Sequence, residues 1–415
     1  MGGFQKPKYG DAVIPMKTES TSLNVLLGKW PIEENTLTFE PFNHEIVDFL
    51  ADLSNALFMD PEIKQFPDLA AFAFFIRKNN LIRLSELHSI SEYRRGRGFV
   101  FHIAPSNIPL NFAYSLTFSL LAGNSNIVRL PSRDYYQVGA VCTALRELMF
   151  NPKYAHISRS IILIRYGHDT EITQLISEIC AVRIVWGGDE TIKRIREIPL
   201  PISAIDIGFV NKYSSALVSA EQVLNSKESV VGKLALNFFK DSFLFDQHGC
   251  SSPKLLIWFG QDDHIRDAKK IFWAKVQSIA ESEYDLQQIH SVDKFVSVSL
   301  LAANHPEVVL VKVSNFLYRL EVATDSPLIG RFQGTNGIFL ETSVKFLEDT
   351  VDLLGSNFQT LTYFGFTKDE LKSIISNLKN EGLDRIVPIG QAFNMETIWD
   401  GMDLIRTLSR VIDLK

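Results

Sequence analysis

Cys250 is the residue of this 415-residue chain whose type and setting best suit covalent chemistry. It lies in the segment 245–253, Phe-Asp-Gln-His-Gly-Cys-Ser-Ser-Pro. Gly249 permits a close approach of the backbone and Pro253 does not continue a helix, so we expect a sharp turn. A thiol on such a turn has free backbone N–H groups beside it and the His248 imidazole two residues away. These conditions lower a thiol pKa and favour the nucleophilic thiolate. The alternative is an inert cysteine in a tight loop.

The other two cysteines are expected to be structural. Cys142 falls on the apolar face of a predicted helix, and Cys180 falls near the end of another. Three cysteines do not make a disulfide framework, so we expect a protein of the reducing cytoplasm.

Charge and hydropathy exclude several classes of partner. The formal net charge of -6 gives no reason to expect a nucleic acid or an anionic membrane surface. No apolar run approaches the roughly 18 residues of a membrane span, and the first residues lack the apolar core of a signal peptide. The basic cluster 94–97 is short, and we expect it to be solvated or directed at a phosphate.

The middle of the chain alternates between short apolar strands and amphipathic helices. Strands are predicted at 99–104, 126–130, 160–164, 182–186 and 202–207, with helices at 110–122, from 134 and from 169. This order indicates a parallel, doubly wound sheet, which typically binds a nucleotide at the carboxyl ends of its strands. No G-x-G-x-x-G fingerprint follows these strands. A dinucleotide would therefore need other contacts, such as Gly187 and Gly188 before a helix.

The pattern changes after about residue 214, where longer helices, the Cys250 turn and a second series of strands follow. Those strands are predicted at 255–258, 308–313, 337–340 and 360–364. Helical stretches at 44–57 and 69–84 are expected to pack on the first sheet. We expect residues 1–212 to form a helical portion and a nucleotide-binding domain, 213–375 to form the catalytic domain, and 376–415 to return to the cofactor domain.

Several segments together resemble a known family. Residues 104–110 and 121–132 are similar to the aldehyde dehydrogenase superfamily, with its proline-x-asparagine, ALAAGN-like and VxKPS-like motifs. The segments 245–253, 383–390, 399–401 and 408–410 resemble the LuxC-type acyl-CoA reductases, also called fatty-acid reductases. The resemblance runs from about residue 99 to 415. It implies an aldehyde dehydrogenase-like α/β fold, with a Rossmann-type cofactor domain and an α/β catalytic domain.

The resemblance also implies a mechanism and a set of site residues. An acyl thioester would pass its acyl group to Cys250, and NADPH would reduce the acyl-enzyme to an aldehyde. Asn107 matches the oxyanion asparagine of the superfamily, although a turn-capping role is the alternative. Arg129 stands where a lysine usually contacts the adenosine ribose, and a guanidinium suits the 2′-phosphate of NADPH, with NADH as the other cofactor. Ser132, Gly187 and Gly188 match cofactor-side positions. No metal is implied.

One segment departs from the superfamily pattern. Hydrolytic aldehyde dehydrogenases carry a glutamate general base where this chain has residues 205–209, Ile-Asp-Ile-Gly-Phe. Asp206 is the candidate there, but its side chain is shorter than that of glutamate. Loss of the glutamate base would suppress hydrolysis of the acyl-enzyme. His248 is the second candidate acid or base. Residues 331–334 offer no clear counterpart to the glutamate that holds the nicotinamide ribose.

Other classes of function remain open from the sequence. Cys250 suits an acyltransferase or thioesterase without redox chemistry, and a catalytically silent scaffold is a further alternative. The family resemblance implies an acyl-protein synthetase as partner, and we also expect a homo-oligomer.

Overall fold

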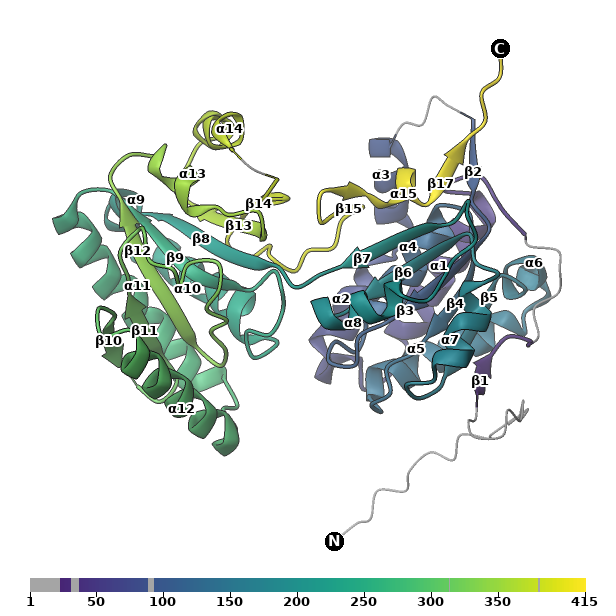
Figure 1. Cartoon of the computed structure of the whole chain (residues 1–415), viewed down its shortest axis with the longest axis horizontal. Helices are drawn as coiled ribbons and strands as arrows, with labels where there is room; N and C mark the ends of the chain where they lie inside the picture. Colours follow the sequence, from purple (N-terminus) through teal and green to yellow (C-terminus); the bar gives the residue numbers. More distant parts are fainter. Residues whose placement is uncertain (1–22, 31–36, 89–92, 313, 380) are drawn as a thin grey trace, which may run out of the picture. The chain divides into compact units, whose positions relative to one another are not determined.

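The computed structural model describes residues 23–30, 37–88, 93–312, 314–379 and 381–415, which form two compact units (Figure 1). Unit 1 comprises Met1–Val210 and Met402–Lys415, and unit 2 comprises Asn211–Gly401. Residues 376–401 thus belong to unit 2, whereas the sequence placed the return of the chain at 376. The reason is that β14 (Arg385–Pro388) pairs with β13 (Phe358–Phe364) at the edge of the unit 2 sheet.

Unit 1 is built on a six-stranded sheet in the order β1-β5-β4-β3-β6-β7. All its strands run parallel except β1, which pairs antiparallel with β5. The strands are β1 (Asn24–Leu27), β3 (Phe99–Ile103), β4 (Ser125–Arg129), β5 (Ile161–Arg165), β6 (Val182–Trp186) and β7 (Ile205–Phe209). The central strands are buried along most of their length, as expected for a sheet covered on both faces. The predicted doubly wound sheet is confirmed.

Helices cover the two faces of this sheet. α7 (Thr170–Ser177) and α8 (Asp189–Arg196) pack on the face that carries Phe101, Ile127 and Ile164. α4 (Asn111–Leu121) lies on the opposite face, where Ser115 bonds to the His102 ring. α5 (Tyr136–Met149) follows β4, and α1 (His44–Phe58) packs on α5 and α4.

The helical stretch predicted at 69–84 is two helices, α2 (Pro67–Phe75) and α3 (Lys78–His88). The Asn80 side chain donates a hydrogen bond to the Phe75 carbonyl, at 2.7 Å. This bond satisfies a carbonyl at the end of α2, so a side chain competes with continuation of the helix.

The basic cluster 94–97 has a structural role. β2 (Arg94–Gly96) pairs antiparallel with β17 (Ser409–Val411), near the end of the chain. The Arg94 guanidinium donates to the Arg406 carbonyl at 2.7 Å, and Arg97 Nε donates to the Thr407 carbonyl at 2.8 Å. Arg95 is exposed, as predicted for a solvated cluster, but the roles of Arg94 and Arg97 were missed. The carbonyls that these two arginines bind lie more than 300 residues away in sequence.

Unit 2 is built on a seven-stranded sheet in the order β10-β11-β12-β9-β8-β13-β14, parallel except for β10. Its remaining strands are β8 (Tyr213–Ser219), β9 (Pro253–Phe259), β10 (Val309–Lys312), β11 (Tyr318–Glu321) and β12 (Ile338–Val344). α10 (Glu228–Phe243) and α11 (Asp262–Glu283) cover one face. α12 (Gln288–Asn304), α13 (Asp349–Leu353) and α14 (Lys368–Asn377) cover the other. No helix among the described residues is long and apolar enough to cross a membrane.

Candidate functional site

The Cys250 turn connects α10 to β9 at the heart of unit 2. Asp246 and Gln247 both adopt the left-handed backbone conformation, with φ of 51° and 63°. The buried Gln247 side chain holds the turn by donating to the carbonyls of Pro253 and Ile338, at 3.1 and 3.0 Å. Its oxygen accepts the Gly337 N–H at 3.0 Å. The turn predicted from the sequence is thus set rigidly by an amide whose role the sequence did not reveal.

Glycine at position 249 is required by a close approach. A Cβ there would lie 2.6 Å from the ring of Phe393, which also stacks edge-on against Phe245 with ring centroids 4.9 Å apart. The loop that carries Phe393 therefore packs directly on the cysteine turn.

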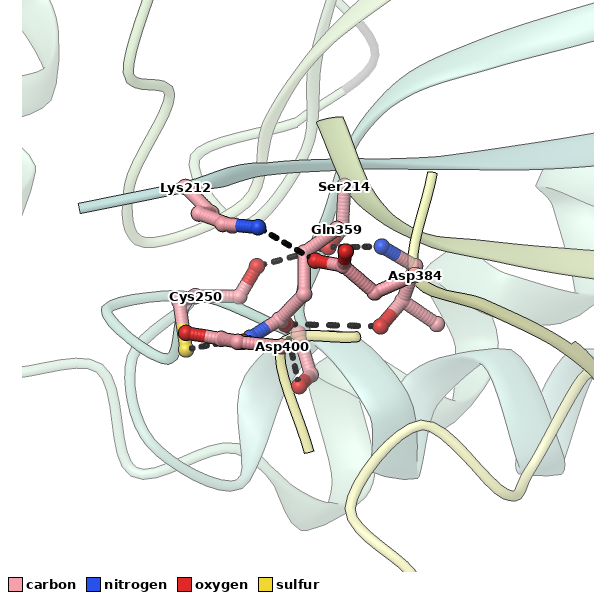
Figure 2. Close-up of polar contacts among 8 residues, drawn as sticks. Lys212, Ser214, Cys250, Gln359, Asp384 and Asp400 are labelled. Carbon is pink, nitrogen blue, oxygen red and sulfur yellow. Dashed lines mark hydrogen bonds and ion pairs between the residues drawn. The ribbon is translucent and has the colours of Figure 1, made fainter. Parts of the chain in front are cut away.

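The Cys250 thiol faces the side chain of Gln359, the second residue of β13 (Figure 2). Gln359 Nε2 donates to Cys250 Sγ at 3.4 Å and to Asp400 Oδ1 at 2.5 Å. The Ser251 hydroxyl donates to Gln359 Oε1 at 2.8 Å. The Ser214 hydroxyl donates to the Cys250 carbonyl at 2.6 Å, which ties the nucleophile to β8. These contacts bring together residues that are far apart in sequence.

The electrostatics of the thiol differ from the expectation. Burial raises the pKa of the Cys250 thiol, and the nearby Asp400 charge raises it further. The bonds from Gln359 and Ser251 and the backbone act in the opposite direction. The predicted lowering of this pKa was wrong, because the turn lies against buried groups rather than in solvent. The thiol consequently needs a proton acceptor before it can act as a nucleophile.

Several further charged groups surround the thiol and were missed by sequence reasoning. Lys212 pairs with Asp384 at 2.5 Å, and both are largely buried. Burial lowers the pKa of Lys254 to about 7, while the charge of Cys250 opposes that shift. Burial also raises the pKa of the Asp400 carboxyl, and the Gln359 bond lowers it. Asp384 and Asp400 lie in segments 383–390 and 399–401, which carry the family resemblance, but the resemblance gave neither residue a role. Lys212 and Lys254 lie outside those segments.

The setting of His248 does not favour its predicted role as an acid or base beside the thiol. The residue is exposed, and no hydrogen bond joins it to Cys250 among the described residues. Burial of part of the ring and the charge of Lys254 lower the pKa of His248.

In unit 1, Asn107 and Ser132 lie at the carboxyl ends of neighbouring strands. Asn107 is exposed in the loop after β3, and Ser132 follows β4. The Ser106 and Ser132 hydroxyls lie 3.1 Å apart, and the Tyr135 hydroxyl donates to the Ser106 carbonyl at 2.8 Å. The strand order reverses at β3, which lies between β4 and β6. Open α/β sheets bind ligands at this switch point.

Arg129 ends β4 at the same edge of the sheet. Its guanidinium donates to the Gly167 carbonyl at 2.8 Å and lies 4.6 Å from the centre of the Tyr166 ring. The side chain is thus held over the loop that follows β5.

Gly187 and Gly188 follow β6, and Gly188 caps α8 with an ordinary φ of -69°. The alternative role for this glycine, a helix cap in the left-handed conformation, is therefore wrong. Asp189 and Glu190 occupy the first turn of α8, so their negative charges oppose a phosphate placed directly on this helix end.

Asp206 forms an ion pair with Arg183. Its carboxylate accepts from Arg183 at 2.5 and 3.3 Å. Arg183 is buried and also donates to the Ile198 carbonyl at 2.9 Å and to the Ser177 hydroxyl at 3.2 Å. The geometry shows a carboxylate that neutralises a buried guanidinium, rather than one held free to accept a proton from water.

Solved structures with the same fold are aldehyde dehydrogenases. The glyceraldehyde-3-phosphate dehydrogenase GapN from Methanocaldococcus jannaschii, solved in complex with NADP, superposes with a TM-score of 0.65 at 12% identity, over 89% of this chain and 88% of that one. An NAD-dependent benzaldehyde dehydrogenase from Corynebacterium glutamicum gives a TM-score of 0.62 at 12% identity, over 88% and 84% of the two chains. These likenesses confirm the aldehyde dehydrogenase-like fold.

Sequence relatives indicate to which family within this fold the chain belongs. A long-chain acyl-protein thioester reductase from Aliivibrio fischeri is 24% identical over 169 residues, which are 40% of this chain and 33% of that protein. Long-chain acyl-protein thioester reductase 2 from Photobacterium leiognathi is 27% identical over 172 residues, 41% of this chain and 34% of that one. The match therefore spans about a third of each relative. The family model for acyl-CoA reductase (LuxC) matches residues 78–411, and the chain accordingly belongs to the LuxC acyl-CoA reductase family.

Proposed function

We propose that this protein reduces an acyl thioester to an aldehyde through an acyl-enzyme on Cys250, with NADPH as the reductant. The observation that carries the proposal is the Cys250 thiol on a rigid turn, with the Gln359 amide donating to its sulfur. A donor to the sulfur stabilises the thiolate both when it attacks and when it leaves. Membership of the LuxC family supports the same reaction.

In the proposed reaction the Cys250 thiolate attacks the thioester carbonyl and expels the donor thiol, which leaves the acyl group on Sγ. Bound NADPH would supply a hydride to the acyl carbon. The resulting thiohemiacetal collapses to the aldehyde and frees the Cys250 thiolate. Negative charge develops on the acyl oxygen in both steps, and the Cys250 backbone N–H is the proposed donor to it. Asn107, in unit 1, is the proposed second donor on the basis of its motif.

Unit 1 has features that suit a nicotinamide dinucleotide. The loops after β3, β4 and β6 lie at the carboxyl edge of a doubly wound sheet, where this architecture binds nucleotides. Arg129 is the proposed contact to a 2′-phosphate, because a guanidinium forms paired bonds with phosphate oxygens. Ser132, Gly187 and Gly188 complete the proposed cofactor residues on the basis of their match to the superfamily, although the acidic first turn of α8 disfavours a phosphate directly on the two glycines.

The acyl donor is proposed to be a CoA or a protein thioester. The first is suggested by the family description and the second by the names of the relatives. A protein donor would require an acyl-protein synthetase as partner.

The direct test is Cys250→Ala, assayed with an acyl-CoA labelled in its acyl chain. The variant is expected to lose both the labelled acyl-enzyme and the oxidation of NADPH, because no other described cysteine is accessible. Cys142→Ala is the matched control and should keep both. Labelling of the Cys250→Ala variant at the wild-type level would contradict the proposal.

A second measurement separates reduction from simple acyl transfer. Binding of NADPH is expected to quench tryptophan fluorescence, because Trp186 ends β6 beside the proposed cofactor loop. An enzyme that forms the acyl-enzyme without binding or oxidising NADPH would instead be an acyltransferase or thioesterase.

A further inference from the structure

The side-chain amide of Gln359 links the nucleophile to a carboxylate. Its nitrogen has two hydrogens, and it donates to Cys250 Sγ at 3.4 Å and to Asp400 Oδ1 at 2.5 Å (Figure 2). Its oxygen accepts the hydroxyls of Ser251 and Thr360, at 2.8 and 3.3 Å. The reverse orientation of the amide would turn its oxygen toward the Asp400 carboxylate. The surroundings therefore fix a nitrogen between the sulfur and the carboxylate.

Cys250 and Asp400 lie close enough to share one negative charge. Both bond to the same amide nitrogen, and the charge of Asp400 acts on the Cys250 thiol. Two anions at such a distance in a buried site oppose each other, so the pair holds one proton over a broad pH range. The charged groups that act on this pair from neighbouring elements are Lys212, Lys254, Asp384 and Arg385.

These groups favour a single anion at the pair. Lys212 and Arg385 stabilise a negative charge at Asp400, whereas Asp384 opposes it. Lys212 is already paired with Asp384, and Arg385 donates to the carbonyls of Ala392 and Asn394. The net result is support for one negative charge, which either the sulfur or the carboxylate can carry.

We propose that Asp400 is the proton acceptor for the Cys250 thiol, and that the Gln359 amide supports whichever of the two is anionic. The inference rests on the proposed function, since it assigns the base of that reaction. Gln359 is a positioning residue here, because it acts through the other two.

The proton balance of the acylation step is complete. In the proposed step the Cys250 proton is transferred to the Asp400 carboxylate by way of one solvent water, which leaves a thiolate and a neutral carboxyl group. The thiolate forms the bond to the acyl carbon and the bond to the donor sulfur breaks. The expelled donor thiolate then takes the proton from Asp400, which restores the carboxylate. Collapse of the thiohemiacetal later frees the Cys250 thiolate, which takes up one proton from solvent.

The test is the pH profile of Cys250 alkylation by iodoacetamide, without acyl donor or cofactor. Peptide mass analysis restricts the readout to Cys250. Wild type is expected to show two steps: a first rise to a plateau as the pair loses one proton, and a second rise as both groups ionise. Asp400→Asn keeps an oxygen for the Gln359 amide but cannot accept the proton. This variant should show one step, below the second wild-type step, because the opposing charge is gone.

Controls make the result decisive. Asp369→Asn removes an exposed carboxylate of the same unit and should keep the two-step profile. A single step in wild type, or identical profiles in wild type and Asp400→Asn, would overturn the assignment. A lower step that persists in Asp400→Asn and is lost in Lys254→Met would assign the acceptor role to Lys254 instead.

The reaction itself supplies an independent readout. Acylation of Asp400→Asn by acyl-CoA should fall by roughly 10²–10⁴-fold, the usual contribution of a general base. If wild type shows the two-step profile but forms no acyl-enzyme, the proton pair stands and the proposed function fails. If acylation is unchanged in Asp400→Asn, the proton assignment fails while the proposed function stands.

Discussion

Individual carboxylates in this protein have different partners, and the partners determine what each can do. Asp400 is shared with the nucleophile through an amide, whereas Asp206 is bound to the buried Arg183 guanidinium. An ion-paired carboxylate has its lone pairs engaged and its charge compensated, so it is a poor acceptor for a proton from water. A reductase that lacks a base for hydrolysis would keep its acyl-enzyme until hydride arrives.

We predict that Asp206→Asn affects stability and leaves hydrolysis unchanged. The substitution leaves Arg183 as an uncompensated buried charge, which typically costs about 3–5 kcal/mol. Urea unfolding should report the loss. The lifetime of the labelled acyl-enzyme without NADPH should equal that of wild type. If the acyl group instead persists much longer in the variant, Asp206 is a working base.

At the scale of elements, the loop from β14 to β15 (Ile398–Trp399) positions Asp400 at the cysteine turn. The Asp241 carboxylate on α10 accepts the N–H groups of Gly390 and Ala392, at 2.6 and 3.1 Å. Arg385 donates to the carbonyl of Ala392, at 3.1 Å, and its guanidinium lies 5.1 Å from the Trp399 ring centre. These anchors hold both ends of the loop, so Asp400 is presented by a fixed segment.

We predict that Asp241 makes the stability of unit 2 depend on pH. Burial raises the pKa of Asp241 to about 7, from an ordinary value of 3.8. The folded protein therefore keeps this proton between pH 4 and 7, while the unfolded chain releases it. The stabilisation is complete below pH 4 and is lost as pH rises through 7. Each pH unit between the two pKa values is worth about 1.4 kcal/mol, so the total is on the order of 4 kcal/mol.

Asp241→Asn tests this dependence, because the variant has no proton to release. Its free energy of unfolding in urea should change less between pH 5 and 8 than that of wild type. Asp369→Asn, at an exposed site, is the matched control and should retain the wild-type slope. An unchanged slope in Asp241→Asn would contradict the prediction.

At the scale of the whole molecule, unit 1 is made of two stretches of sequence that are separated by unit 2. Residues after Met402 add β17 beside β2 and bury Leu404, Ile405 and Leu408 in unit 1. The Leu408 carbonyl accepts from the buried Asn124 side chain, at 2.9 Å. Residues 402–415 therefore form part of the core of unit 1, although unit 2 separates them from the rest of it in sequence.

We predict that deletion of residues 402–415 destabilises unit 1. Each buried leucine or isoleucine contributes about 1.5–3 kcal/mol, so the loss should amount to several kcal/mol. Chemical unfolding followed by hydrogen exchange of the unit 1 strands measures it. Deletion of residues 413–415, which are exposed, is the control and should have little effect. Unit 1 strands that exchange at the wild-type rate in the longer deletion would contradict the prediction.

The sequence by itself determined the class of fold, most of the strands and the candidate nucleophile. Apolar runs and helical periodicity reflect which residues are buried within one strand or helix. The bounds of four strands, β3, β4, β5 and β6, were therefore predicted nearly to the residue. Cys250 was recognised because a turn and a family motif are both local patterns.

Only the tertiary structure decided the partners of those residues. Gln359 lies 109 positions from Cys250, and its contact depends on β13 pairing with β8, which in turn pairs with β9. Arg183 and Asp206 meet because β6 and β7 are neighbours in register. The raised pKa of the Cys250 thiol follows from burial and from the charge of Asp400. Sheet order and register set these distances, and neither is encoded in the spacing of residues along the chain.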